Sequence, residues 1–322
     1  MPRRATVVMG TVVLAAVLAA CTDDGGSGPV PPAASGFEFG VIGDFPYTPA
    51  QVPMFDRLIE DMNTEPLAFT LHVGDIGSQA CTDTDLRDAR ASFDRFAAPL
   101  VYTPGDNEWT DCHQSGIDPL ARLARVREEL ASQPRSHGRR TLDLERQTPG
   151  YPENSRFSFG EVMFVGVHQV GSNDGLGRTP EGDAEHAARA DANRAWVRAG
   201  FEAASAARSR GVVVFIQANP DFERYAVAVP TGHTDLLRAV EREVLAFRRP
   251  VLMVHGDTHT FRVDKPLLGP DRRRVESFTR LETFGSPDVH WSRVVVDPDR
   301  PELFSFIPET VGANVVDHGT RR

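Results

Sequence analysis

FEFGVIGD, residues 37–44, is an apolar, strand-like run that ends in Gly43 and Asp44. The same arrangement returns in FTLHVGD (69–75), LVYTPGD (100–106) and VLMVHGD (251–257). Glycine lets the backbone turn sharply where a strand ends. The aspartate that follows then stands at the carboxyl edge of a sheet, where α/β proteins bind ligands. The repeated Gly-Asp pairs therefore predict one ligand-binding edge that carries several carboxylates.

Carboxylates gathered at one edge would repel one another strongly unless cations held them. Asp44 and Asp75 are 31 residues apart, and so are Asp75 and Asp106. Because one βαβ unit takes roughly 30 residues, we expect these three aspartates to end neighbouring strands. Asp257 and His259 lie two residues apart, and alternate residues of an extended segment point the same way. The pattern predicts a metal-dependent enzyme.

The composition is that of a globular protein with one large domain or two small ones. Of the 322 residues, 40% are hydrophobic and 25% are charged, which is enough for a sizeable core. The formal net charge of −10 argues against general nucleic-acid binding, which needs a basic surface. A phosphate-bearing substrate is compatible with this charge, since bound metal ions reverse the local potential.

The N-terminus has the pattern of a secretory signal. Two arginines precede an apolar stretch, residues 6–18, that is too short to span a bilayer comfortably. The ending LAAC (18–21) resembles a bacterial lipobox, which implies a signal peptide over residues 1–20 and a lipidated Cys21. An ordinary cleaved signal with a chance cysteine is the alternative. Residues 21–36 are rich in Gly, Ser, Pro and Ala, and predict a flexible tether with a mean reach of roughly 20 Å. We therefore expect an extracytoplasmic protein that is anchored to the cell membrane by lipid.

Cys81 and Cys112 are the remaining cysteines, and each lies six residues after the aspartate of a Gly-Asp pair. Secreted proteins meet an oxidising compartment, so a remaining pair is usually a disulfide. A bridge here would tie two loops of the site together. Zinc binding is the alternative, although two isolated cysteines lack the paired C-x-x-C spacing of a zinc site.

Strand-like and helical segments alternate in the first half of the chain, which indicates parallel βαβ units. The tail after Thr260 is mainly strand-like. We expect one layered α/β domain over residues 37–310, whose later strands form a second, more antiparallel sheet. Residues 132–152 look like an irregular insertion. The predicted strands are 37–42, 69–73, 100–103, 156–159, 162–168, 212–218, 251–255, 278–283, 292–296 and 303–307, and the predicted helices are 52–63, 85–97, 119–131, 191–208 and 234–247.

The blocks around the aspartates resemble the calcineurin-like metallophosphoesterase superfamily, whose pattern is D-x-H, G-D, G-N-H-D/E, a lone His and G-H-x-H. The resemblance covers about residues 37–260 and implies a layered sandwich of two mixed β-sheets flanked by helices. The blocks here are Asp44-Phe45-Pro46, Gly74-Asp75, Gly105-Asp106-Asn107-Glu108, Gln217-Ala218-Asn219-Pro220 and Gly256-Asp257-Thr258-His259.

Several positions depart from this pattern. Pro46 replaces the first histidine, and Asp106 stands where the family has asparagine. Asn107 takes the place of the histidine that contacts the substrate phosphate, and Asp257 replaces the first histidine of the last block. These changes leave a site that is richer in oxygen ligands than the family pattern.

The resemblance implies two divalent metal ions that share Asp75. The lone histidine has become Asn219, with Gln217 as the alternative. Carboxylate and amide oxygens suit Mg²⁺, Mn²⁺ or Ca²⁺, whereas imidazoles favour Zn²⁺ and iron. The harder ions are therefore favoured here. The implied ligands are Asp44, Asp75 and His259 for one ion, and Asp75, Asp106, Asn219 and Asp257 for the other.

The implied activity is hydrolysis of a phosphate mono- or diester. Asn107 could donate a hydrogen bond to the substrate phosphate but could not act as the acid. His255, His113 and Glu108 are candidates for the acid. His255 could instead be a core histidine, and Glu108 could instead orient a neighbouring loop. Tyr47, Trp109 and His113 follow the ligand blocks and could line the pocket, with packing as the alternative for Trp109. The polar segment 171–175 could border the pocket, but a plain turn is the favoured interpretation.

A rival hypothesis remains open at this point. Four histidine positions of the family are changed, which favours a domain that keeps the fold, has lost hydrolysis, and acts as a binding or structural module. Against it, most of the replacements are themselves good metal ligands.

Overall fold

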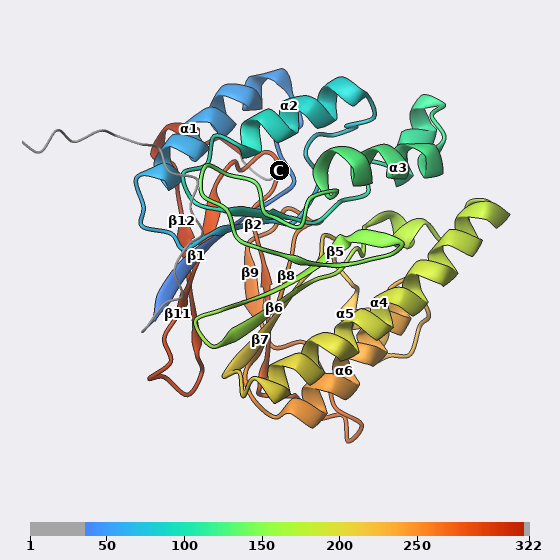
Figure 1. Ribbon diagram of the computed structural model, residues 1–322, viewed down its shortest axis with the longest axis vertical. Helices are drawn as coiled ribbons and strands as arrows, with labels where there is room; N and C mark the ends of the chain where they lie inside the picture. Colours follow the sequence, from blue (N-terminus) through green and yellow to red (C-terminus); the bar gives the residue numbers. More distant parts are fainter. Residues whose placement is uncertain (1–35, 319–322) are drawn as a thin grey trace, which may run out of the picture.

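The structure is a computed structural model that describes residues 36–318. Two β-sheets pack face to face, and helices cover the outer face of each (Figure 1). This confirms the predicted sandwich of two mixed sheets flanked by helices. The predicted signal peptide, Cys21 and the predicted tether up to residue 35 lie outside the described residues. Within residues 36–318, no helix is both long and apolar enough to cross a membrane.

The first sheet consists of β1 (Phe37–Ile42), β2 (Thr70–His72), β3 (Leu100–Tyr102), β11 (Trp291–Val296) and β12 (Phe304–Glu309). The strand order is β12-β11-β1-β2-β3. β1, β2 and β3 are parallel, and helices connect them. β11 runs antiparallel to β1, with Val296 opposite Phe37, and β12 runs antiparallel to β11.

The second sheet consists of β4 (Glu145–Gln147), β5 (Tyr151–Phe159), β6 (Val162–Gly166), β7 (Gly211–Phe215), β8 (Val251–His255), β9 (Arg262–Asp264) and β10 (Phe278–Glu282). The strand order is β4-β5-β6-β7-β8-β10-β9. β6, β7, β8 and β10 are parallel, while β4, β5 and β9 pair antiparallel at the two sides. The carboxyl ends of the parallel strands therefore share one edge, as they do in the first sheet.

Three α-helices pack on the first sheet, and three others pack on the second (Figure 1). Thr82 starts α2 with a capping box to Asp85, and Thr179 caps α4 by accepting a hydrogen bond from the Gly182 amide. Such caps are each worth about 1 kcal/mol. The helices are α1 (Val52–Asn63), α2 (Asp83–Phe93), α3 (Pro119–Leu130), α4 (Pro180–Ala206), α5 (Phe222–Ala226) and α6 (Thr234–Phe247), with short 3₁₀ helices η1 (Pro49–Gln51), η2 (Thr110–Ser115), η3 (Ser172–Gly175) and η4 (Gly312–Asn314).

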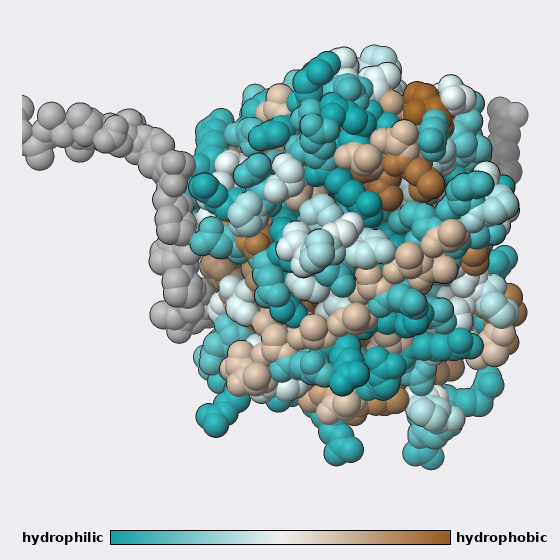
Figure 2. Space-filling view, turned by 45° about the vertical axis from the view of Figure 1, so that its right-hand side comes forward, coloured by the Kyte–Doolittle hydropathy of each residue, from teal (hydrophilic) through white to brown (hydrophobic). Residues whose placement is uncertain are grey.

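An aromatic core holds the two sheets face to face. Phe39 stacks on Phe69 with ring centres 5.1 Å apart, and Phe164 from the second sheet meets Phe69 edge-on at 5.0 Å. Phe37 and Phe159 make a further contact across the sheets at 4.8 Å. Each buried aromatic ring contributes roughly 1.5–3 kcal/mol. On the face drawn in Figure 2, by contrast, hydrophilic residues predominate and hydrophobic ones form only small groups.

The later strands do not form a sheet of their own, so that part of the expectation is wrong. β9 and β10 extend the second sheet, whereas β11 and β12 extend the first. The cause is packing, because Val294 and Val296 of β11 fill the core between the sheets beside β1. The unassigned residues 132–152 contain β4 and a bridge between His137 and Leu100.

Candidate metal centre

The aspartates of the four Gly-Asp pairs form one cluster where the carboxyl ends of the two sheets meet. Asp44, Asp75 and Asp106 follow β1, β2 and β3, and Asp257 follows β8 of the other sheet. Besides burial, the negative charge of Asp106 raises the pKa of both Asp44 and Asp75, and the charge of Asp257 also raises the pKa of Asp44. Side chains from both sheets thus contribute to a single group of acids, in which Asp44, Asp75 and Asp106 are buried and Asp257 is partly buried.

Strained backbone places several of these side chains. The backbone is left-handed at Asp44 (φ 60°), Asp75 (φ 58°), Asp257 (φ 80°) and His259 (φ 61°). A non-glycine residue in this conformation costs on the order of 1–3 kcal/mol, and such residues concentrate at functional sites. The rest of the fold therefore holds these four side chains in place against a local cost.

The glycines of the motif make room for the carboxylates. A Cβ atom on Gly105 would lie 2.0 Å from Asp75 Oδ1, and one on Gly256 would lie 2.0 Å from Asp44 Oδ2. Any side chain at either glycine would therefore push a carboxylate out of the cluster. This close approach gives Gly105 and Gly256 a second purpose besides the turn.

Two carboxylate oxygens of the cluster are buried and take no hydrogen bond from residues 36–318. They are Asp44 Oδ2 and Asp106 Oδ1. A Cβ atom on Gly171 would lie 2.9 Å from Asp106 Oδ1 and 2.6 Å from Asp257 Oδ1, so these two oxygens face the same spot. Buried charged oxygens are normally hydrogen-bonded or bound to metal. The donor set therefore fits a cation.

The electrostatics of the cluster point the same way. Burial, and then the charge of Asp257, raises the pKa of Asp44 well above its usual value. Burial also raises the pKa of Asp75 and Asp106, and raises that of Asp257 to about 7. Without a cation in the cluster, these carboxyl groups ionise less readily than ordinary aspartates. A divalent cation would offset both the desolvation and the mutual repulsion.

His259 is oriented as a metal-binding histidine would be. Its Nδ1 lies 2.7 Å from the Ser286 carbonyl oxygen, to which it donates, so the other ring nitrogen carries the lone pair. That nitrogen, Nε2, lies 3.8 Å from Asp44 Oδ1. The ring is further held edge-on against Tyr47, with centres 5.2 Å apart. A cation bound beside Asp44 could therefore be coordinated by His259 Nε2.

Both carboxylate oxygens of Asp75 accept hydrogen bonds from neighbouring residues. Its Oδ2 accepts from the Tyr47 hydroxyl at 2.8 Å and from Asn107 Nδ2 at 3.0 Å, and its Oδ1 accepts from the Asn107 amide at 3.2 Å. Among the described residues, no group of three or more His, Cys, Asp and Glu side chains stands ready to hold a metal ion. To act as a shared ligand, Asp75 would have to exchange some of these hydrogen bonds. The hydrogen bond from Tyr47 to Asp75 was not predicted from the sequence.

Asn219 and Gln217 take different positions. The backbone amide of Asn219 donates to Asp257 Oδ2 at 2.9 Å, while its side-chain oxygen accepts from the Asp221 amide at 3.4 Å. Gln217 is buried, its Oε1 accepts from the Gly171 amide at 2.6 Å, and its Nε2 has no partner within residues 36–318. Gln217 lies close enough to Asp257 to influence the pKa of that carboxyl, but the atom that it leaves without a partner is a donor, which cannot bind a cation.

Glu108 joins the loops of the site. Its Oε1 accepts from the Ile76 amide at 3.1 Å and from the Tyr102 hydroxyl at 3.0 Å, and its Oε2 accepts from the Gly105 amide at 3.1 Å. The side chain is fully buried, and burial raises its pKa to about 7. These contacts support the alternative that it orients the loops around Asp75, and they leave it little freedom to act as an acid.

His255 is not suited to be the acid. It is fully buried, its Nδ1 lies 2.8 Å from the Gly256 carbonyl oxygen, and burial lowers its pKa to about 3. A neutral ring of this kind gives up a proton poorly at neutral pH. His113 lies in η2, where its Nδ1 is 2.8 Å from the Thr110 carbonyl oxygen.

The turn at residues 171–175 is more than a plain turn. Ser172, Asn173 and Asp174 are left-handed one after another, and Gly171 lies against the cluster. Asp174 Oδ1 accepts from the Val170 amide at 3.0 Å and from Arg189 Nη1 at 2.6 Å. Both side chains of this ion pair are fully buried. A Gly-Ser-Asn-Asp-Gly sequence predicts a turn, but nothing local reveals that an arginine from α4 fixes it.

The predicted disulfide is confirmed. Cys81 and Cys112 are bonded, with their Cα atoms 5.5 Å apart. Their sulfurs lie 3.8 and 3.7 Å from the carbonyl oxygen of Asn107. The bridge therefore ties the loop after Asp75 to the loop after Asp106.

Comparison with known proteins supports the fold. No protein-family model matches the sequence, and comparison with curated proteins gives no match. The structure is similar to purple acid phosphatase PPD1 isolated from yellow lupin (Lupinus luteus) seeds, with a TM-score of 0.50 and 9% identity. The chain has a metallophosphoesterase-like fold. The alignment covers 89% of this chain and 55% of the lupin chain, so this chain spans about half the length of that phosphatase.

Two other solved structures give lower scores. GAP50, the anchor in the inner membrane complex of Plasmodium, has a TM-score of 0.48 and 10% identity over 86% of this chain and 89% of its own. TT1561 of Thermus thermophilus has a TM-score of 0.47 and 9% identity over 85% of this chain and 99% of its own. At these identities the likeness concerns the fold, and activity has to be argued from the site.

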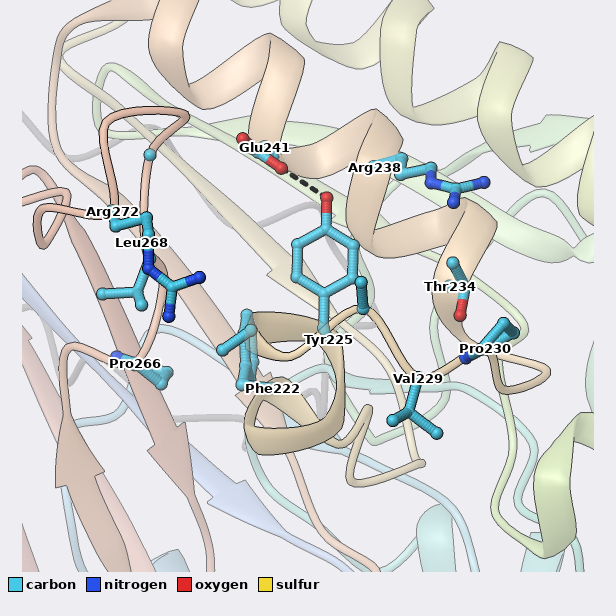
Figure 3. A pocket seen from close by; sticks show the side chains of 13 residues that line it. Phe222, Tyr225, Val229, Pro230, Thr234, Arg238, Glu241, Pro266, Leu268 and Arg272 are labelled. Carbon is cyan, nitrogen blue, oxygen red and sulfur yellow. Dashed lines mark hydrogen bonds between the residues drawn. The ribbon is translucent and has the colours of Figure 1, made fainter.

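One cavity of about 250 Å³ lies away from the cluster, between α5, α6 and the segment after β9 (Figure 3). Tyr225 and Glu241 are hydrogen-bonded within it, and Val229, Arg238 and Arg272 lie around them. None of the aspartates of the cluster lines this cavity. It is therefore not the candidate metal centre.

Proposed function

We propose that this protein hydrolyses phosphate mono- or diesters at a centre of two divalent metal ions. One observation carries the proposal: the buried Asp44, Asp75 and Asp106 cluster with the partly buried Asp257 of the other sheet, and Asp44 Oδ2 and Asp106 Oδ1 have no hydrogen-bond partner within residues 36–318. Buried carboxylates in such number are stable when cations lie among them. The metallophosphoesterase-like fold supports the same reaction by analogy.

The ligands divide into two groups around Asp75. Asp44 and His259 would hold one ion, and Asp106 and Asp257 would hold the other, with Asp75 shared. Asn219 stays the proposed amide ligand of the second ion, because the Gln217 oxygen already accepts from the Gly171 amide and the unpartnered Gln217 Nε2 is a donor that cannot bind a cation. The set contains one imidazole among oxygen donors, which favours Mg²⁺, Mn²⁺ or Ca²⁺ over Zn²⁺ or iron.

Bound ions would supply charge neutralisation and would lower the pKa of a water molecule at the site. The reaction adds the oxygen of water to phosphorus, breaks the bond between phosphorus and the ester oxygen, and returns a proton to the departing alcohol. Asn107 has a role that the chain itself offers, since its Nδ2 can turn from Asp75 to donate to a phosphate oxygen. Glu108 holds the backbone of both loops during this change.

Metal content and hydrolysis test the proposal together. The full chain, loaded separately with Mg²⁺, Mn²⁺, Ca²⁺ and Zn²⁺, is assayed with para-nitrophenyl phosphate and with bis(para-nitrophenyl) phosphate. We expect two ions per chain by elemental analysis and hydrolysis of at least one ester. Full activity in Asp75→Asn would contradict the mechanism, since both ions depend on that residue.

A non-catalytic module is the second candidate function. It is favoured by one observation, the hydrogen bonds that Tyr47 and Asn107 make to both oxygens of Asp75. In this case the cluster would bind at most one ion, and its hydrogen bonds would stabilise the folded structure without supporting catalysis. One ion per chain, without hydrolysis of either ester, would establish it.

Membrane attachment is a separate proposal, because its residues lie outside the described part of the chain. The LAAC ending supports a lipidated Cys21, and the acidic protein would be held outside the cytoplasm by that lipid. In a bacterial host, the wild-type chain should incorporate labelled palmitate and sediment with membranes. Cys21→Ser should lose both the label and the sedimentation, and an unlabelled wild-type chain would contradict the proposal.

A further inference from the structure

A side pocket of about 430 Å³ opens between the loops that follow β1 and β2. Phe45, which directly follows Asp44, and Ile76, which directly follows Asp75, both line it. α1 and α2 form its other walls. The pocket therefore begins one residue away from two aspartates of the cluster.

Tyr47 connects the pocket with the cluster. It lines the pocket, and its hydroxyl lies 2.8 Å from Asp75 Oδ2. A group attached to a phosphate at the cluster could pass Tyr47 and enter the pocket. Most of the walls are apolar, and they include the rings of Phe45, Phe55 and Phe93. Pockets of this kind hold apolar parts of ligands, while a few polar groups set the orientation.

His72 supplies such a polar group. It lines the pocket and is fully buried. Its Nδ1 accepts a hydrogen bond from the Gly74 amide at 3.2 Å, so its proton must be on Nε2. Nε2 has no hydrogen-bond partner within residues 36–318. A buried donor without an acceptor is costly, and an acceptor on a ligand would remove that cost.

We propose that this pocket binds the alcohol portion of the phosphate ester, as an uncharged aromatic group that carries a hydrogen-bond acceptor for His72. The inference rests on the proposed hydrolysis, because it assumes that the phosphate lies at the cluster. Asp56, Asp85 and Asp88 at the pocket disfavour an anionic group there.

Binding of free phenols tests the pocket without any reaction. Para-acetylphenol and para-ethylphenol have similar shapes, but only the first has a carbonyl acceptor. With the full chain in Mg²⁺, titration calorimetry should show para-acetylphenol binding about tenfold more tightly, the value of one hydrogen bond. His72→Phe should abolish that preference, and His72→Gln, which keeps a donor, should restore part of it.

A second pair of variants tests the location without touching the buried histidine. Ala89 lies on α2 and lines the pocket, whereas Ala91 on the same helix is exposed and does not. Ala89→Phe should weaken the binding of both phenols by tenfold or more, because the new ring fills the pocket. Ala91→Phe, the matched control, should bind them like the wild type.

The possible outcomes distinguish failure of the proposed binding pocket from failure of the proposed hydrolysis. Equal affinity for the two phenols, or unchanged binding in Ala89→Phe, overturns the pocket even if esters are hydrolysed. Absence of hydrolysis together with the expected phenol results overturns the proposed reaction and leaves the pocket as a binding site. With both intact, para-acetylphenyl phosphate should lose kcat/KM in Ala89→Phe while methyl phosphate should not.

Discussion

The amide of Asp257 donates a hydrogen bond of 3.0 Å to Asp44 Oδ1, although the two residues are 213 positions apart in the chain. Asp44 follows the first strand of one sheet, and Asp257 follows a central strand of the other. The bond therefore fixes how the edges of the two sheets meet. It also leaves Asp44 Oδ2 free of hydrogen bonds from residues 36–318, buried beside the other aspartates.

Asp106→Asn should weaken metal binding and stabilise the metal-free protein. The change removes one charge from a buried, repulsive cluster, so we expect a gain on the order of 1–2 kcal/mol at pH 8 in excess chelator. Urea unfolding measures the stability, and calorimetry measures metal affinity. Asp299→Asn, in the exposed turn between β11 and β12, is the matched control and should change neither.

The stability of the metal-free protein should depend on pH through Asp257. Its folded pKa of about 7 lies above the ordinary value of 3.8, so the folded state holds a proton that the unfolded state has lost. Stability from this group is therefore lost as pH rises from about 4 to 7.

The measurement compares wild type with Asp257→Asn, because buried histidines such as His72, with a pKa lowered to about 3, give the opposite trend below pH 6.5. Between pH 5 and pH 8 in chelator, wild type should lose thermal stability relative to the variant. Added Mg²⁺ should reverse that loss at pH 8. Parallel pH curves would contradict the prediction.

Loss of the disulfide should destabilise the protein and loosen the site. Cys81 and Cys112 are 31 residues apart, and a loop of that length predicts a loss of roughly 3–4 kcal/mol in the double serine variant. Metal affinity should fall as well, because the bridge ties the loops after Asp75 and Asp106. Denaturant unfolding and calorimetry measure both effects. An unchanged unfolding midpoint would show that the bridge does not constrain the chain.

Arg189→Met should release the turn at residues 171–175. The variant leaves the buried carboxylate of Asp174 without its arginine, at a cost of about 3–5 kcal/mol. Arg189→Met combined with Asp174→Asn should recover part of that loss, since the fully buried carboxylate is then neutral and only Glu185, the other partner of Arg189, still lacks its arginine. Arg198→Met, at an exposed position of the same helix, is the control and should have little effect.

Several elements could be predicted from the sequence because their signals are local. The predicted strands 37–42 and 251–255 and the predicted helices 52–63 and 234–247 have the bounds that the structure gives to β1, β8, α1 and α6. Continuous apolar runs predicted the strands, and apolar periodicity predicted the helices. α4 begins eleven residues before its predicted start, because its first turns are polar and show no apolar stripe.

Strand partners could not be predicted in the same way. β11 pairs with β1, so Val296 lies opposite Phe37 from the far end of the chain. Pairing of this kind depends on which sheet edge remains free once the rest has folded, and no local pattern records it.

The candidate aspartates, their glycines and the disulfide between Cys81 and Cys112 could be predicted from the sequence, because the Gly-Asp motif is local and only two cysteines remain besides Cys21. Only the packed structure shows that the Gln217 side chain accepts a hydrogen bond from the Gly171 amide, that Glu108 holds the loops, and that Tyr47 contacts Asp75. These facts depend on side-chain directions and on contacts between segments far apart in the chain. They are settled only when the two sheets pack against each other.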